Sequence, residues 1–226
     1  MSGLATGNSP FSTFVQVAPH LLRVMRHMRP TWHVPGLSAV TPAFLREQVI
    51  RGVVWDVDGT LTGDRQPALA PESDTPFRAL AGDPALRHVV LSNAGEERYR
   101  QLGTIFPGMP ILRAYTLGPE ILYRRLQGTD DTWTAEELAR RVAAGARVIR
   151  KPSAELVVYA LRELGCAQDE AVMIGDQYLT DVAGANLGGV RSIKLPTLSR
   201  ETFRPVVRFS QVLERGLYTV LYGGAS

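Results

Sequence analysis

Four short apolar runs, each closed by small or polar residues, constrain the fold of this chain more than any other feature. They span Gly52–Trp55, His88–Leu91, Ala171–Ile174 and Val190–Leu195. Unbroken hydrophobicity over so short a run fits a strand covered on both faces, and such strands belong to parallel sheets. Three of the runs stop at Asp56, at Ser92-Asn93 and at Gly175-Asp176.

Helical patterns lie between these runs, over 97–102, 135–143 and 153–164. Thr134 and Glu137 have the spacing of a capping box at the start of the second helix. Strands that alternate with helices predict an α/β fold, here a Rossmann-like parallel sheet with helices on both faces. Ligands of such sheets bind where the strands end, so we expect the polar residues that close the runs to meet at one site.

Composition excludes several classes of protein. The 226 residues are 45% hydrophobic and 21% charged, which is typical of a soluble globular chain. No apolar run reaches the ~18 residues of a transmembrane helix, and the first residues lack the pattern of a secretory signal, so we expect a cytoplasmic protein. A net charge of +3, without dense basic stretches among aromatic residues, argues against nucleic acid as a partner.

Residues 1–50 are predicted to form a lead-in segment, and residues 51–226 the main domain. Within the lead-in, residues 19–29 read as a short helix with Leu21, Leu22, Met25 and Met28 on one face and arginine and histidine around the other. Two interpretations remain open. The apolar face packs on the core, or the helix lies on an anionic lipid surface as a peripheral membrane contact.

Two acidic clusters follow buried strands. Asp56 and Asp58 stand two residues apart, and Asp176 and Asp181 come some 120 positions later. Neighbouring carboxylates repel each other unless a cation lies between them, and a hard ion such as Mg²⁺ prefers oxygen ligands. An Asp-Gly surface turn at Asp58-Gly59 is the simpler alternative for the first cluster alone. The second cluster favours a shared metal site.

Lys151 stands out in a chain with 23 arginines and only two lysines. An ammonium group on a flexible stem is a compact charge that suits a phosphate oxygen. Ser92 and Asn93, at another predicted strand end, supply small hydrogen-bonding groups. These residues together indicate a site for a phosphorylated ligand.

Four segments in this order, 56–60, 92–93, 151–152 and 175–181, resemble the motifs of haloacid dehalogenase-superfamily phosphatases. The resemblance implies that Asp56 is a nucleophile that forms an aspartyl-phosphate, and that Asp58 is the general acid and base. It also implies a magnesium ion held by Asp56, Asp176 and the backbone carbonyl of Asp58, with Asp181 in support. Ser92, Asn93 and Lys151 would hold the phosphoryl oxygens.

Two further stretches, 37–42 and 175–186, resemble the YqeG-type, phosphatidylglycerophosphate phosphatase-like branch, which has little or no cap domain. The stretch between Asn93 and Lys151 is longer than that branch needs, and the excess around 115–146 is either a small lid or a surface elaboration.

The resemblance implies a phosphomonoester hydrolase whose substrate is a phospholipid head group such as phosphatidylglycerophosphate or another phosphorylated small molecule. A soluble sugar or nucleotide phosphate, and a catalytically idle binding protein of the same fold, remain as alternatives. The oligomeric state is left open.

Overall fold

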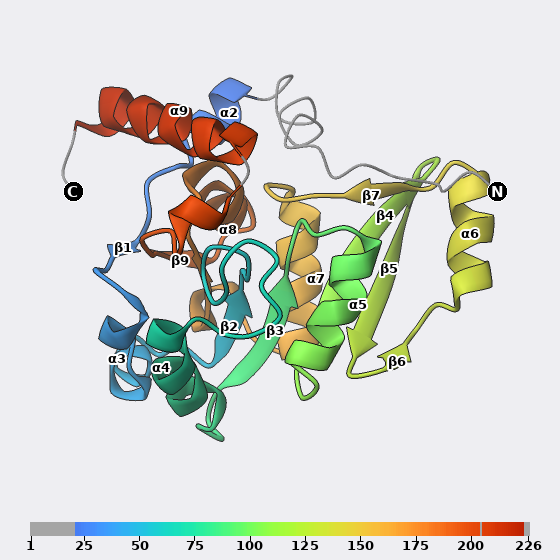
Figure 1. Cartoon of the computed structure of the whole chain (residues 1–226), viewed down its shortest axis with the longest axis horizontal. Helices are drawn as coiled ribbons and strands as arrows, with labels where there is room; N and C mark the ends of the chain where they lie inside the picture. The colour runs from blue at the N-terminus through green and yellow to red at the C-terminus, as the bar shows by residue number, and fades with distance from the viewer. Residues whose placement is uncertain (1–20, 204, 224–226) are drawn as a thin grey trace.

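The computed structural model describes residues 21–203 and 205–223, and a mixed sheet runs through this part of the chain (Figure 1). The strand order is β1-β9-β8-β2-β3-β4-β5-β6, with β7 also paired to β4. The strands span Trp32–His33 (β1), Gly52–Trp55 (β2), Arg87–Leu91 (β3), Ile111–Leu117 (β4), Glu120–Gln127 (β5), Asp130–Asp131 (β6), Arg147–Ile149 (β7), Ala171–Gly175 (β8) and Arg191–Lys194 (β9).

Neighbouring strands from β1 to β4 run parallel, and β5, β6 and β7 pair antiparallel. The predicted α/β fold with a mostly parallel sheet is therefore confirmed. The antiparallel part was not predicted.

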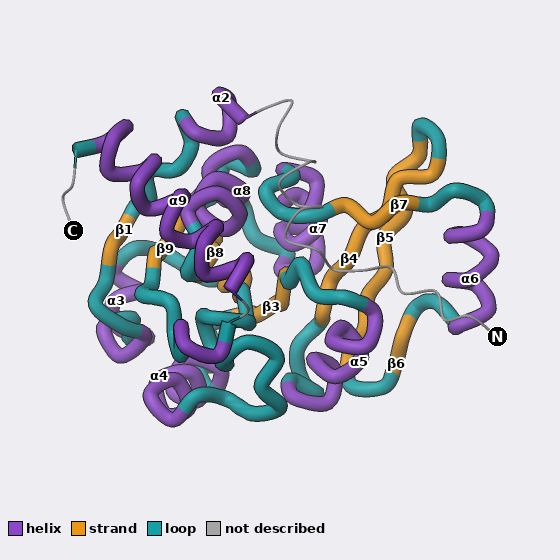
Figure 2. Tube along the Cα trace, turned by 45° about the horizontal axis from the view of Figure 1, so that its top comes forward, coloured by secondary structure: helices purple, strands orange, loops and turns teal. Residues whose placement is uncertain are grey.

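Helices cover both faces of the sheet (Figure 2). Those described are α2 (Leu21–Met25), α3 (Pro42–Glu47), α4 (Pro71–Ala81), α5 (Glu96–Ile105), α6 (Ala135–Ala143), α7 (Ala154–Leu164), α8 (Ala183–Leu187) and α9 (Pro205–Tyr222), with short helical turns at Leu37–Ala39 (η2), Gln168–Glu170 (η3), Tyr178–Val182 (η4) and Arg200–Thr202 (η5). The helices predicted over 97–102, 135–143 and 153–164 correspond to α5, α6 and α7. Thr134 caps α6 by accepting a hydrogen bond from the backbone of Glu137 at 3.1 Å.

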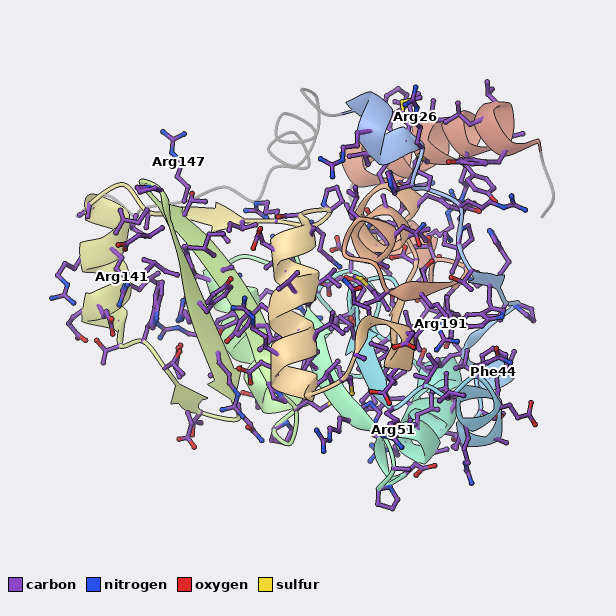
Figure 3. All side chains as sticks on the ribbon, turned by 180° about the vertical axis from the view of Figure 1, so that it is seen from behind. Arg26, Phe44, Arg51, Arg141, Arg147 and Arg191 are labelled. Carbon is purple, nitrogen blue, oxygen red and sulfur yellow. The ribbon has the colours of Figure 1, made fainter. Side chains whose placement is uncertain are left out.

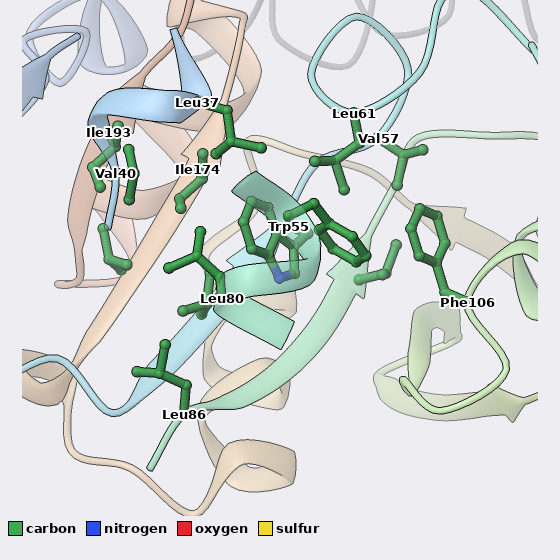
Figure 4. Packing of buried hydrophobic residues seen from close by; sticks show 14 of the residues in the cluster. Leu37, Val40, Trp55, Val57, Leu61, Leu80, Leu86, Phe106, Ile174 and Ile193 are labelled. Atoms are coloured by element: carbon green, nitrogen blue, oxygen red, sulfur yellow. The ribbon is translucent and has the colours of Figure 1, made fainter. Parts of the chain in front are cut away.

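Alternation along β2 divides the core between the two faces. Val53 and Trp55 pack with α3, α4 and α5, whereas Val54 packs with α7. Trp55 is fully buried and meets Phe77 of α4 edge to face at 5.3 Å, within the cluster drawn in Figure 4. Successive side chains of a strand point to opposite faces. The buried positions of Val54 and Trp55 therefore also determine the direction of Asp56, the residue that follows them.

The lead-in segment contacts the main domain through the pairing of β1 with β9 and through two sets of buried apolar residues. Leu37, Val40, Leu45 and Ile50 belong to the core cluster around Trp55. Val24 and Met28 are buried with residues of η4 and α8. The predicted helix over 19–29 is described from residue 21, where its helical part is α2; residues 19 and 20 lie outside the described part.

The stretch predicted to be an insertion, around 115–146, lies in the antiparallel part of the sheet, which starts from β4 at Ile111. It forms the antiparallel hairpin of β4 and β5, then β6, and α6, before β7 returns to β4. Tyr115, Trp133 and Ala146 form a small buried cluster under α6. This stretch therefore extends the sheet sideways. The sequence of 111–127 does not by itself indicate strands, because arginines stand among its apolar residues.

Candidate active site

Three buried carboxylates meet at the carboxyl ends of β2 and β8. Asp56 directly follows β2, Asp176 directly follows β8, and Asp181 lies in η4. One oxygen from each lies within 4.8 Å of the others. Residues some 120 positions apart in the chain are brought together because β2 and β8 are adjacent parallel strands that end at the same edge.

Two glycines make this approach close. Gly59 has a φ of 94°, and a Cβ built on it would lie 2.8 Å from Asp176 Oδ2. A Cβ on Gly175 would lie 2.4 Å from Asp181 Oδ2. Any side chain at either position would displace a carboxylate of the cluster, and at Gly59 the backbone conformation is also unfavourable for other residues.

Lys151 lies within this acidic cluster. Its Nζ pairs with Asp56 Oδ1 and donates to Asp181 Oδ1 at 2.6 Å. The ammonium group is 3% exposed. Burial alone would lower the pKa of Lys151, but the adjacent Asp181 and Asp56 carboxylates outweigh that effect and raise it. Lys151 is therefore charged at neutral pH.

The carboxylates carry more charge than one lysine balances. Burial, then repulsion from Asp181, raises the pKa of Asp56 to about 7, against the lowering effect of Lys151. Burial, then repulsion from Asp56 and Asp181, raises the pKa of Asp176 well above its usual range. Asp176 Oδ2 is also buried without a hydrogen-bond partner in the described part of the chain. An orphaned carboxylate oxygen in an all-oxygen cluster fits a hard divalent cation.

The remaining oxygens of the cluster are hydrogen-bonded. Thr60 Oγ1 donates to Asp56 Oδ2 at 2.9 Å. Asp181 Oδ2 accepts from the Gln177 backbone at 3.0 Å. Asp181, with both oxygens engaged by protein donors, is less available to a metal than Asp176 is.

Asp58 faces a different partner. Its side chain lies outside the three-carboxylate group, and its Oδ1 accepts from Arg98 Nη2 at 2.7 Å. The Arg65 backbone and the Thr62 hydroxyl donate to the same oxygen at 3.2 and 3.3 Å. Arg98 itself is 4% exposed. This pair holds the Asp58 carboxylate in one orientation at the edge of the cluster.

Ser92 and Asn93 follow β3, the other neighbour of β2. Asn93 is bonded to the backbone of Lys151 in both directions: Oδ1 accepts from Lys151 N at 2.8 Å and Nδ2 donates to Lys151 O at 3.2 Å. Ser92 Oγ accepts from the Ala94 backbone at 3.2 Å. Asn93 thus fixes the segment that carries Lys151.

Comparisons with known proteins agree with this arrangement. The HAD-hydrolase-like family model matches residues 148–197, the segment that contains Lys151, Asp176 and Asp181. The "Probable phosphatase YqeG" of Bacillus subtilis (strain 168) is 25% identical over 193 residues, which cover 85% of this chain and 90% of that protein. Both matches support a phosphatase of the haloacid dehalogenase superfamily.

Two other matches are weaker or shorter. The bovine "Phospholysine phosphohistidine inorganic pyrophosphate phosphatase" is 34% identical over 125 residues, 52% of this chain, but the match spans only 44% of that relative. A solved structure of an uncharacterized protein from Listeria monocytogenes serotype 4b has a TM-score of 0.43 at 18% identity over 69% of this chain and 83% of that chain.

Arg98 was missed as a site residue by sequence reasoning. It lies on α5, and helix periodicity alone does not say which of the arginines in that helix points toward Asp58. Thr60 was seen only as part of the first acidic motif, without its hydrogen bond to Asp56.

Proposed function

We propose that the protein is a Mg²⁺-dependent phosphomonoesterase that acts through an aspartyl-phosphate on Asp56. The observation that carries this proposal is the cluster of Asp56, Asp176, Asp181 and Lys151, in which Asp176 Oδ2 is buried without a partner. Carboxylates of Asp56 and Asp176 and the backbone carbonyl of Asp58 would hold the ion. When bound, the ion would neutralise negative charge on the phosphoryl group during transfer.

The first half-reaction is attack by a carboxylate oxygen of Asp56 on phosphorus. The bond to the ester oxygen breaks, and the Asp58 carboxyl donates a proton to the leaving alkoxide. In the second half-reaction Asp58 takes a proton from water, which attacks the aspartyl-phosphate and releases inorganic phosphate. Arg98 keeps Asp58 oriented through both steps.

Lys151 and the loop after β3 would hold the phosphoryl oxygens. Lys151 is charged and touches Asp56, so it lies beside the oxygens of any phosphoryl group attached there. Ser92 and the backbone near Asn93 come from the adjacent strand end. We assign them the remaining phosphoryl contacts.

For the substrate we propose a phosphate monoester, with phosphatidylglycerophosphate as the first candidate. This candidate rests on the resemblance of residues 37–42 and 175–186 to the YqeG-type, phosphatidylglycerophosphate phosphatase-like branch. The likeness to the YqeG protein over most of both chains supports a phosphatase but names no substrate. A soluble sugar or nucleotide phosphate is the alternative.

A substrate screen with and without Mg²⁺ tests the proposal. It should include phosphatidylglycerophosphate in detergent micelles, glycerol 3-phosphate, glucose 6-phosphate, AMP and pyrophosphate. We expect metal-dependent release of phosphate, loss of turnover in Asp56→Asn, and no effect of Asp130→Asn, an exposed carboxylate on β6. Hydrolysis by Asp56→Asn at the wild-type rate would refute the nucleophile. Mg²⁺ binding without hydrolysis of any ester would indicate the idle binding protein.

A further inference from the structure

Helix α9 carries most of the exposed apolar surface in the described part of the chain. Among the described residues, seven large hydrophobic side chains are exposed, and five of them lie on α9: Phe209, Val212, Leu213, Val220 and Leu221. Phe209, Leu213 and Val220 are 64%, 54% and 83% exposed. The other two, Val49 and Val142, lie on separate elements.

Four of these five residues form one stripe of the helix, and Leu221 stands to one side of it. Phe209, Val212 and Leu213 stand at positions i, i+3 and i+4, and Val220 continues the same face two turns further on. The opposite face is buried, since Gln211 and Glu214 are each 4% exposed. From Phe209 to Val220 the stripe is roughly 17 Å long, on a helix of 18 residues.

Helix α2 lies beside α9 and contributes positive charge. Tyr222 Oη donates to the Met25 carbonyl at 2.8 Å, and Leu217, Tyr218 and Tyr222 pack with Val24 in one cluster. The exposed arginines of α2 and its end are Arg23, Arg26 and Arg29, and α9 adds Arg208. Figure 3 labels Arg26 at the outer side of α2, next to α9.

The charge on this pair of helices has one sign at its surface. Within 21–29 and 205–222 the sequence contains a single acidic residue, Glu214. Glu214 is buried and accepts a hydrogen bond from the Leu179 backbone at 2.9 Å. The α2–α9 surface, defined by the exposed apolar stripe and these four arginines, is therefore apolar and cationic.

We propose that the α2–α9 surface docks on an anionic lipid bilayer. Apolar side chains in line along one helix, with arginines beside them, match the apolar interior and charged head groups of such a surface. A second copy of this chain fits less well, because it would bring arginines against arginines. None of the described helices is long and apolar enough to cross a membrane, so α9 would lie in the interface.

The position of α9 joins this surface to the site. Glu214 of α9 holds the backbone of η4, the segment that follows Asp176. In Figure 1, α9 and α2 lie beyond the ends toward which the β2 and β3 arrows point. A docked molecule would thus present the carboxyl edge of its sheet, with the acidic cluster, on the membrane side.

Vesicle co-sedimentation of the full chain tests the docking. Vesicles of phosphatidylcholine alone are compared with vesicles that contain about 30 mol% phosphatidylglycerol. We expect binding to the anionic vesicles only, weakened at about 0.5 M NaCl because salt screens the arginines. Replacing Phe209, Leu213 and Val220 together by serine should lower the partition coefficient about tenfold or more.

A matched control replaces Val49 and Val142, the exposed apolar residues elsewhere, by serine; its binding should stay at the wild-type level. Both variants should keep wild-type circular dichroism and wild-type hydrolysis of soluble para-nitrophenyl phosphate. The docking does not depend on the proposed activity, so a protein without phosphatase activity still yields a binding result.

Three results would overturn the proposal. They are no binding to anionic vesicles, equal binding by the triple variant and the wild type, and a dimer in analytical ultracentrifugation that the triple variant abolishes. The last result would assign the stripe to a contact between copies of the chain.

Discussion

Mg²⁺ binding should depend steeply on pH, because the carboxylates that would hold the ion retain protons near neutrality. The pKa of Asp56 is raised to about 7, chiefly by burial, and that of Asp176 is raised well above its usual range. Metal ligands must be deprotonated, so the ion competes with protons at this site.

The size of the effect follows from Asp56 alone. A carboxyl group of pKa about 7 is roughly one-tenth ionised at pH 6 and roughly nine-tenths ionised at pH 8, so the apparent affinity for Mg²⁺ should rise about tenfold. Protons on Asp176 make the rise steeper. At Mg²⁺ concentrations well above Kd, a tenfold higher affinity adds about 1.4 kcal/mol to the free energy of unfolding. For a chain of this size, the Mg²⁺-dependent rise in Tm should then be about 3 to 6 °C larger at pH 8 than at pH 6.

The ion-free protein should show the opposite trend. The unfolded chain ionises Asp56 near pH 3.8, but the folded chain retains the proton to about pH 7. The unfolded state therefore binds fewer protons in this window, and the stability of the ion-free fold falls as pH rises through it. Added Mg²⁺ should recover stability over the upper part of this range and beyond.

Thermal unfolding in EDTA and in Mg²⁺, measured from about pH 6 to about pH 8, checks this prediction. Asp176→Asn should lose most of the Mg²⁺-dependent rise in Tm. Asp58→Asn should keep it, because the Asp58 side chain pairs with Arg98 and only its backbone carbonyl would face the ion. The same rise in Tm at both ends of the pH range would refute the assignment of these protonated carboxylates as ligands.

Substitutions at Gly59, Glu214 and Arg98 also have defined outcomes. Gly59→Ala should weaken Mg²⁺ binding and lower stability by about 1 to 3 kcal/mol, and Gly145→Ala, at a similar φ of 98° but with open space around it, should lower stability without changing Mg²⁺ binding. Glu214→Gln should raise Tm at pH 8 but not at pH 4. Burial raises the pKa of the Glu214 carboxyl from 4.5 to about 7, so the folded state loses about 3 kcal/mol of stability as pH rises between those values. Chemical denaturation of the variant and the wild type at both pH values measures the difference. Arg98→Met should lower kcat by about 10- to 100-fold with little change in KM or in Mg²⁺ binding, since Asp58 loses its orienting partner. Arg98→Lys should recover part of kcat. Equal losses in kcat, in substrate affinity and in Mg²⁺ binding would indicate a structural role of Arg98 instead.

The parallel core was predictable because its signal is local. Strands covered on both faces must be continuously apolar, and the runs before Asp56 and Asp176 satisfy that condition within four or five residues. The strand ends then had to meet at one edge. The meeting of Asp56 with Asp176 followed from strand order and not from fine geometry. Lys151 comes from the loop after β7 and contacts Asp56 and Asp181.

The antiparallel stretch could not be predicted in the same way. Arg113 and Arg124 interrupt the apolar pattern of β4 and β5, although both are buried in the fold. The charges of these buried arginines are neutralised by a carboxylate distant in sequence. Glu96 of α5 pairs with Arg113 at 3.0 Å and with Arg124 at 2.8 Å. Periodicity within one segment carries no information about a counter-ion on another.

The same ion pairs bear on what this stretch does for the site. Arg113, on β4, donates to the carbonyl of Ala94, and Arg150, just after β7, donates to the carbonyl of Asn93 at 2.7 Å. Two consecutive carbonyls of the loop after β3 are thus held by the antiparallel part of the sheet. That loop in turn fixes Lys151 through Asn93.

Helix α5 connects this support to Asp58, the proposed acid and base. Its first residue, Glu96, is anchored by the arginines of β4 and β5. Two residues later in the same helix, Arg98 pairs with Asp58. Buried ion pairs of this kind contribute little net stability but fix the orientation of the groups they join. The stretch that sequence reasoning left as either a lid or a surface elaboration is, by its contacts, better explained as a support. It holds the loop after β3 through Arg113 and Arg150, and α5 through Arg113 and Arg124. The positions of Lys151 and Asp58 therefore both depend on Arg113.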